Sequence, residues 1–243
     1  MKTIILFLFF FLGLNNYAQN SRNLTVEYKL YIAENNNSKS NDLLKSVASE
    51  NGKITFNLFI NDSVSYFIEN NGISSSELSV ILAMAKAKYY VPLYYCNKIF
   101  LQNNDPSFVF FYNNEFLIER KSNLNWNITS ETKMIDGNLC YKAVSSDYYY
   151  HTKNDRRNFE VTAWFCPKLP FKFGPMYYND LPGLILETSY LDVRLIATKI
   201  EYKLDPKSIS KPFGDKSISF DDYSSELTNK MKEMFGELEK IKK

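Results

Sequence analysis

The residues that most often perform catalysis are scarce in this 243-residue chain, which has one histidine and three cysteines. A Ser-His-Asp or Cys-His mechanism would therefore have to use His151. That histidine lies in the polar stretch DYYYHTKNDRR, which predicts an exposed loop rather than a catalytic centre. The chain also lacks G-x-S-x-G, C-x-x-C and H-x-x-x-H spacings and a glycine-rich phosphate loop. We therefore predict no catalytic residue, no metal site and no cofactor, and expect a protein that is not an enzyme.

The three cysteines are Cys96, Cys140 and Cys166, and an odd number in an exported protein leaves at least one of them unpaired. Cys140 and Cys166 lie in neighbouring predicted strands, so the sequence allows a disulfide between them. The favoured interpretation is that both are buried and act as small apolar side chains.

Glycine and proline are also scarce, at eight residues each, whereas aromatic residues make up 16% of the chain. This composition excludes a disordered chain and favours a β-rich globule, because Tyr and Phe suit half-buried pleated surfaces. The net charge is only +2, which gives no electrostatic reason to expect nucleic acid or a strongly anionic membrane as a partner.

One apolar run stands out in length, and it lies at the N-terminus. Residues 5–14 follow Lys2 and end shortly before the small residue Ala18. This run is too short to span a bilayer, so residues 1–18 are predicted to be a signal peptide cleaved after Ala18, with an uncleaved anchor as the less favoured alternative. No cysteine precedes Cys96, which excludes a lipid anchor at a new N-terminal Cys. We expect a periplasmic protein, or alternatively an extracellular one, that does not span the membrane.

Alternation of apolar and polar residues predicts β-strands along most of the remaining chain, as in Leu24, Val26 and Tyr28 with their polar neighbours. Asn51-Gly52 predicts a hairpin turn, because both residues tolerate the positive φ that a two-residue turn requires. A second hairpin is predicted about Asn113-Asn114. The predicted strand regions are 24–32, 54–60, 63–69, 108–119, 126–132, 139–145, 158–166 and 184–202.

The apolar period changes to that of a helix in two places. Residues 74–90 carry a capping box at Ser74 and Glu77, which predicts a short helix. In the C-terminal tail, apolar residues recur at steps of three and four after Asp221-Asp222, which predicts an amphipathic helix. No internal repeat interrupts the pattern, so residues 19–243 are predicted to form one mainly β (α+β) domain.

The stretch DLPGLIL combines a rigid turn with three consecutive aliphatic residues. Pro182-Gly183 predicts the centre of a type II turn, in which Gly183 supplies the positive φ. Together with Gly174-Pro175, it makes residues 168–183 a long connection between strands. The run Leu184-Ile185-Leu186 is apolar on both faces, so we predict a covered core strand, with a ligand or partner surface as the alternative.

Several short motifs recur in a fixed order between residues 124 and 202, and this ordered set resembles the GLPGLI family. The resemblance implies an exported protein of a Gram-negative envelope, without an established activity. Two positions depart from the family pattern: Asp180 replaces the first glycine of its namesake motif, and Asn138 replaces an aromatic residue. The matching pieces are Trp126; Glu131, Thr132 and Lys133; Ile135 and Gly137; Cys140–Ala143; Ala163–Phe165; Leu169-Pro170; Gly174-Pro175; and Leu181–Glu187.

The resemblance implies a curved antiparallel sheet or half-barrel packed on the C-terminal helix, similar to periplasmic lipoprotein carriers. The recurrent residues are interpreted as architecture rather than chemistry. Trp126 and Trp164 are predicted to be buried anchors whose indole N–H groups need partners. Glu131 and Lys133, two residues apart on a strand, are predicted to share one face and to pair across it.

Exposed tyrosines are the candidate binding surface. Tyr148, Tyr149 and Tyr150, with Tyr177 and Tyr178, are predicted to form an aromatic rim for a ligand or partner, with a half-buried strand edge as the alternative. The first functional hypothesis is a non-enzymatic protein that binds an apolar ligand or peptide on the concave side of the sheet. The second is an accessory subunit that docks to an outer-membrane receptor or another envelope complex.

Overall fold

The computed structural model describes residues 23–33, 49–61, 64–70, 98–102, 105–112, 116–121, 124–152, 155–203 and 216–223. The predicted signal peptide, the helix of residues 74–90, the turn at Asn113-Asn114 and the C-terminal helix beyond residue 223 lie outside these ranges. The single-domain assignment therefore stays a prediction.

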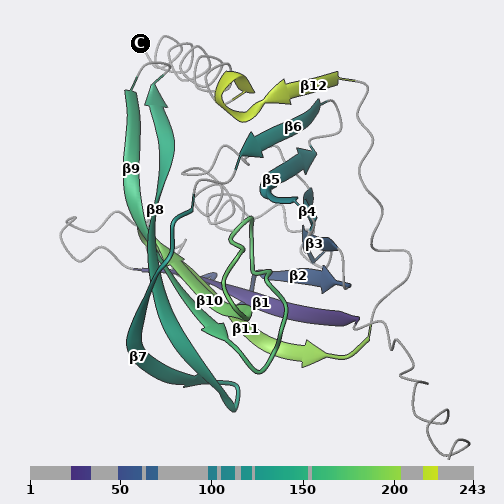
Figure 1. The fold of residues 1–243 in the computed structure, drawn as a ribbon, viewed down its shortest axis with the longest axis vertical. Coiled ribbons are helices and arrows are strands. Elements are labelled where there is room, and N and C mark those ends of the chain that lie inside the picture. The colour runs from purple at the N-terminus through teal and green to yellow at the C-terminus, as the bar shows by residue number, and fades with distance from the viewer. Residues whose placement is uncertain are drawn as a thin grey trace, which may run out of the picture.

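The described residues form one 12-stranded sheet with the strand order β12-β6-β5-β4-β3-β2-β1-β11-β10-β9-β8-β7 (Figure 1). Neighbouring strands are antiparallel, except that β12 runs parallel to β6. The strands are β1 (Leu24–Ile32), β2 (Thr55–Ile60), β3 (Val64–Glu69), β4 (Lys98–Gln102), β5 (Asp105–Tyr112), β6 (Phe116–Lys121), β7 (Asn127–Ile135), β8 (Asn138–Thr152), β9 (Asp155–Cys166), β10 (Leu184–Tyr190), β11 (Val193–Glu201) and β12 (Lys216–Ser219).

The sheet is strongly curved but not closed, because its terminal strands β7 and β12 do not pair with each other. The long hairpin of β8 and β9 runs along one side of the molecule, and β3 to β6 stack on the other side (Figure 1). Strands β1, β2, β10 and β11 form the base between them. The prediction of a mainly β protein with a curved antiparallel sheet is confirmed.

Strand β1 has the range that its sequence pattern predicts, and it lies near the centre of the sheet. Its residues alternate between buried and half-buried, with Leu24, Val26 and Tyr28 fully buried. It pairs with β2 on one side and with the distant β11 on the other. Burial of one apolar face therefore defines the strand, and pairing on both edges satisfies its backbone groups.

Two turns differ from their predictions. Gly52 has the expected positive φ of 76°, but Asn51 does not take a positive φ. Asn51 instead uses its side chain, which accepts a hydrogen bond from the Ile32 amide (2.7 Å) and donates one to the Ile32 carbonyl (3.0 Å). The region 184–202 is two strands, which are joined by a turn where Leu191 has a φ of 53°.

Strand β8 is longer than its sequence predicts. It continues to Thr152 and includes His151, so the prediction of a loop at this histidine is wrong. The reason is its partner: Tyr148 and Tyr149 pair with Asn158 and Arg157 of β9. Backbone pairing between two long strands supplies hydrogen bonds whatever the side chains are, so polar residues at this end stay in the ladder.

The predicted long connection before β10 is confirmed, and it packs against the start of that strand. The amides of Leu184 and Ile185 donate hydrogen bonds to the carbonyls of Leu169 (2.9 Å) and Phe173 (3.0 Å). Because β11 pairs with β10 only from Glu187 onward, the connection takes the place of β11 beside these two residues. Leu184, Ile185 and Leu186 are all fully buried, so the prediction of a covered core strand is confirmed.

The turn at Pro182-Gly183 is tighter than the predicted type II turn. The Gly183 amide donates to the Leu181 carbonyl (2.8 Å), which closes a three-residue γ-turn about Pro182. Gly183 has a positive φ of 156°, as predicted. A Cβ atom at Gly183 would lie 2.3 Å from the carbonyl oxygen of Cys166. Glycine is therefore required because two backbone segments meet here.

Asp180 has a positive φ, a backbone conformation that glycine adopts most readily. Its φ is 66°, its amide donates to the Lys172 carbonyl (2.9 Å) and its carboxylate lies 3.5 Å from Lys172 Nζ. Asp tolerates this left-handed region better than most residues. The departure from the family pattern at Asp180 is thus compatible with the same turn.

We predict that Gly183→Ala destabilises the fold by about 3 kcal/mol or more, because the new methyl group overlaps the Cys166 backbone. Gly137→Ala is the matched control, since Gly137 also has a positive φ (73°) but has open space around its Cβ position. The control should cost about 1–2 kcal/mol of backbone strain alone. Urea denaturation measures both, and equal losses would contradict the close-approach argument.

Candidate functional site

Motif residues that are scattered along the sequence converge on one face of β7 to β10. Lys133 of β7 lies opposite Cys140 of β8. Lys142 of β8 lies opposite Trp164 of β9, which in turn lies opposite Glu187 of β10. We call Glu131, Lys142, Trp164, Lys133 and Glu187 the β7–β10 ladder.

Two ion pairs hold the ladder together. Lys133 Nζ lies 2.7 Å from Glu187 Oε2 and 4.2 Å from the centre of the Trp164 ring. Lys142 Nζ lies 2.8 Å from Glu131 Oε1. The prediction that Glu131 pairs with Lys133 is therefore wrong.

A bulge in β7 explains this difference. Ile128 pairs with Ala143 and Thr132 pairs with Tyr141, so residues 129–131 lie opposite Lys142 alone. The bulge bends the strand and directs Glu131 toward Lys142. The period-two rule assumes a regular strand, and it fails where the strand carries extra residues.

The two tryptophans are half-buried rather than fully buried. Trp126 Nε1 donates a hydrogen bond to the Asn179 carbonyl (2.8 Å), and its ring meets Tyr178 edge to face at 6.4 Å. The prediction that its indole N–H has a partner is confirmed. Trp126 thus ties the residues before β7 to the long connection.

A second group of residues, not expected from the sequence, lies on the inner side of the sheet. Arg120 of β6 and Asp147 of β8 form a buried ion pair through Nη2 and Oδ1. The hydroxyl of Tyr177 donates to the other carboxylate oxygen, and the Tyr148 amide donates to Asp147 Oδ1 (2.8 Å). With Phe220, these residues form what we call the Arg120 cluster.

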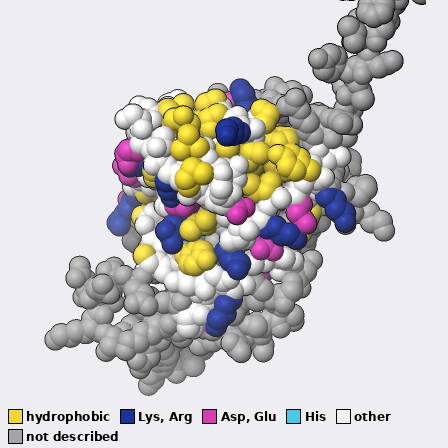
Figure 2. Space-filling view, turned by 90° about the horizontal axis from the view of Figure 1, so that it is seen from below, with side chains coloured by type: hydrophobic (Ala, Val, Ile, Leu, Met, Phe, Trp, Pro, Cys, Tyr) yellow, Lys and Arg dark blue, Asp and Glu magenta, His cyan; other side chains and the backbone are white. Residues whose placement is uncertain are grey.

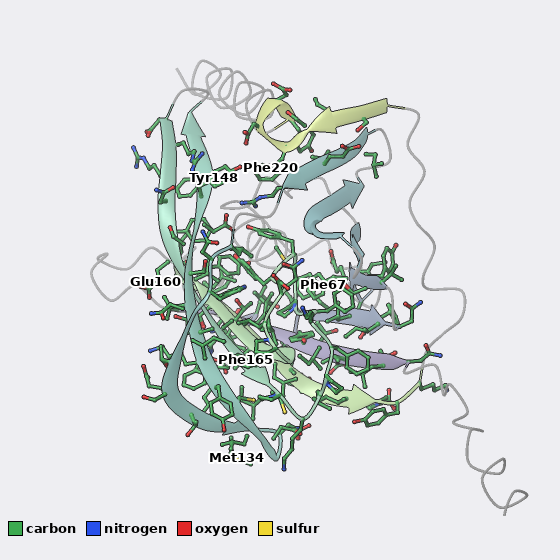
Figure 3. All side chains as sticks on the ribbon, in the orientation of Figure 1. Phe67, Met134, Tyr148, Glu160, Phe165 and Phe220 are labelled. Carbon is green, nitrogen blue, oxygen red and sulfur yellow. The ribbon has the colours of Figure 1, made fainter. Side chains whose placement is uncertain are left out.

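Aromatic rings surround the guanidinium group of Arg120. Its Cζ atom lies 4.3 Å from the ring centre of Phe220, 4.4 Å from that of Tyr177 and 4.9 Å from that of Tyr148. Tyr148 also donates a hydrogen bond to Asp221 Oδ1 (3.0 Å). The cluster therefore joins β6, β8, the long connection and the turn after β12, and Tyr148 and Phe220 lie together at one end of the molecule (Figure 3).

The pKa values in the cluster follow from burial and from these neighbours. Burial alone would lower the pKa of Arg120, but the Tyr177 and Asp147 oxygens outweigh it and keep that pKa above its ordinary value. Burial, and then the nearby Asp147 carboxylate, raise the pKa of Tyr177 well above 10, against the opposing effect of Arg120. Arg120 is thus permanently charged and Tyr177 stays a neutral hydrogen-bond donor.

The prediction of an exposed tyrosine rim is wrong. Tyr148, Tyr177 and Tyr178 are buried and Tyr149 is half-buried, whereas the Tyr150 side chain lies outside the described part. Their rings pack on one another and on the core: Tyr177 on Tyr178 at 4.8 Å, for example. A tyrosine in a polar stretch looks exposed in sequence, but the hydroxyls of Tyr148 and Tyr177 donate hydrogen bonds to Asp221 and Asp147 within the fold.

The sequence contains a weak signal for the missed pair. Asp147 stands at even spacing from Ala143 and Ser145, which are both buried on the same face of β8. A carboxylate on a buried face requires a cationic or hydrogen-bonding partner. Nothing in the sequence identifies that partner as Arg120, because β6 and β8 are not neighbours in the sheet.

The two cysteines that the structure describes, Cys140 and Cys166, are not placed to act as nucleophiles. Cys140 and Cys166 are buried free thiols, which confirms the interpretation as small apolar side chains. Burial, and the neighbouring Cys166, raise the pKa of Cys140 to about 12. Thiolates are the reactive form, so Cys140 is unreactive in this state.

No three His, Cys, Asp or Glu side chains in the described ranges lie together so as to hold a metal ion. Within the same ranges, no helix is long and apolar enough to cross a bilayer.

These observations define an open, strongly curved β-sheet protein with a charged ladder on one face and an aromatic-enclosed ion pair on the other. A model of the family described as "Protein of unknown function (Porph_ging)" matches residues 150–187. The match contains the Gly174-Pro175 and Leu181–Glu187 motifs. It relates this segment to a family without an assigned function.

Two solved structures of PNGF-II resemble the fold. The structure in space group C2 has a TM-score of 0.50 and 16% identity, and covers 85% of this chain and 33% of that chain. The structure in space group P21 has a TM-score of 0.48 and 17% identity, and covers 82% and 32%. The chain thus spans about a third of PNGF-II, and the likeness concerns the fold alone. The comparison with curated proteins finds no match.

We predict that Arg120→Met destabilises the protein by about 3–5 kcal/mol, because it leaves the Asp147 carboxylate buried without its cation. The double variant Arg120→Met with Asp147→Leu should recover much of this loss, since no buried charge remains. Arg157→Met is the control, because it breaks the exposed ion pair with Asp155 and should leave the unfolding midpoint nearly unchanged. Urea denaturation measures the free energy of unfolding of each variant. If Arg120→Met lost no more stability than Arg157→Met, the Arg120–Asp147 pair would not be important for stability.

We predict that the protein loses stability as the pH rises above about 10, the ordinary pKa of tyrosine. Burial raises the pKa values of Tyr28, Tyr177, Tyr178 and Tyr190, so the unfolded chain loses these protons first. Their contribution is fully present below pH 10 and is lost as the pH increases. Absorbance at 295 nm should show part of the tyrosines ionising only together with the loss of far-UV circular dichroism. Complete ionisation with native circular dichroism would refute the buried tyrosine cluster.

Proposed function

We propose that this protein is an exported, non-enzymatic docking protein that binds another envelope polypeptide through the exposed end of the β7–β8 hairpin. The observation that carries the proposal is the exposed apolar pair of Met134 and Leu139. These residues lie directly opposite each other, and they are 61% and 39% exposed. Ile128, on the same terminal strand, is 49% exposed.

The surroundings of this pair favour a protein partner. Figure 2 shows apolar side chains gathered on the lower face, with charged side chains between and around them. Met134 lies at this lower end, opposite the end that carries Tyr148 and Phe220 (Figure 3). An exposed apolar patch with a charged rim is typical of protein–protein contact sites.

The β7–β10 ladder supplies charges on the other face of the same hairpin, because Lys133 and Met134 are consecutive in β7 and point to opposite faces. Glu131 and Lys142 are partly exposed, and Lys133 is 32% exposed above the half-buried Trp164. A partner that reaches around the terminal strand β7 would meet both the apolar pair and these charges. Charges at a rim orient a partner and speed association more than they add affinity.

A small apolar ligand inside the sheet is less well supported. The tyrosines expected to receive it are used in internal packing, since Tyr177, Tyr178 and Tyr190 are all buried against each other or the core. The match covers 33% of the PNGF-II chain, so in PNGF-II the similar fold is joined to further polypeptide. Export follows from the predicted signal peptide, and non-enzymatic binding follows from the sequence, in which no catalytic motif is recognised.

The test is capture from an envelope extract with three versions of the purified protein. We expect a defined partner to bind the wild type and the Leu191→Ser control, and to be lost from the Met134→Ser/Leu139→Ser variant. Leu191 is a matched control, because it is also an exposed apolar residue (49%). It lies in the turn between β10 and β11, whereas Met134 and Leu139 lie on β7 and β8. Equal capture by all three, or none by any, would contradict the proposal. Stoichiometric lipid or small ligand in mass spectra of extracted protein would restore the carrier hypothesis.

A further inference from the structure

Cys140 and Cys166 lie just beyond the last pair of the β8–β9 ladder, on neighbouring strands. The register of β8 and β9 pairs Tyr141 with Phe165, and one further step in each strand brings Cys140 to Cys166. Directly opposite residues of antiparallel strands have Cα atoms about 4.5–5.5 Å apart. Disulfides require Cα separations of about 4.4–6.8 Å, so the backbone already has a suitable spacing.

Each cysteine also has a partner residue on its other side, in β7 or β10. Cys140 pairs with Lys133 of β7, and Cys166 pairs with Leu184 of β10. Both residues are fully buried, and the proximity of Cys166 contributes to the raised pKa of the Cys140 thiol. Cys166 also provides the carbonyl that Gly183 approaches, so the pair lies beside the turn on which β10 depends.

We propose that Cys140 and Cys166 form a cross-strand disulfide when the chain folds in an oxidising compartment. The two thiols lose two protons and two electrons as the S–S bond forms. The electrons pass to the disulfide of a thiol–disulfide oxidant, which becomes a dithiol. In this structure the pair is in its reduced state.

The burial of the pair determines when oxidation takes place. A pKa of about 12 leaves almost no thiolate at Cys140 in the folded state, so exchange must precede the closing of β8 on β9. Once formed, the bond is shielded from reductants by the same burial. It would cross-link the chain between β8 and β9, and so constrain the unfolded state.

The experiment refolds the full chain with a mixture of reduced and oxidised glutathione. The protein is then denatured in excess iodoacetamide and its intact mass is measured. We expect one alkylated cysteine in the wild type, since Cys96 remains, and none in Cys96→Ser. Treatment with dithiothreitol should leave the native pair oxidised and should reduce it only after denaturation.

Two results would overturn the proposal. Two alkylated cysteines in a natively folded Cys96→Ser variant would show that the pair stays reduced. Peptide mapping that links Cys96 to either partner in the wild type would show a different pairing. Cys140→Ser, checked by circular dichroism for folding, should have two alkylated cysteines. This outcome does not depend on whether the β7–β8 hairpin binds a partner.

Discussion

The buried ion pair between Arg120 and Asp147 constrains the sheet, because neither charge tolerates burial without its partner. Arg120 lies on β6, next to the terminal strand β12, and Asp147 lies on β8, next to the terminal strand β7. An open sheet has no backbone hydrogen bonds to hold its two ends together. The ion pair, the Tyr177 hydroxyl and the ring of Phe220 supply that contact across the interior. Because both charges are removed from water, the geometry is demanding, and the aromatic rings exclude the solvent that would weaken it.

The long connection between β9 and β10 completes this interior. It contributes Tyr177 to the ion pair, and it supplies the carbonyls of Leu169 and Phe173 to the start of β10. The close backbone contact at Gly183 brings the connection back against the end of β9. The stretch DLPGLIL therefore contributes to the fold: its turn positions a fully buried strand start. The next residue, Glu187, enters the charged ladder on the other face.

The two faces of β7 to β10 have different consequences for function. The inner face is consumed by packing, so its tyrosines are not available as a contact surface. The hairpin of β7 and β8 extends to an end where Met134 and Leu139 stay exposed. The bulge and charged residues of β7 discourage another strand from pairing along this edge, as is usual for terminal strands. A partner would therefore bind through side chains at the end of the hairpin rather than by adding a strand to β7.

The sequence by itself determined the local features: the range of β1, the fully buried run from Leu184 to Leu186, and the positive φ of Gly183. Each depends on residues close in the chain, through side-chain alternation or backbone sterics. Only the tertiary structure decided the partners. It paired Arg120 with Asp147, and it set Lys133 against Glu187 instead of Glu131. The physical reason is that strand order and a bulge bring together groups with no sequence relationship, and buried charges and hydroxyls take whichever partner lies within hydrogen-bonding distance.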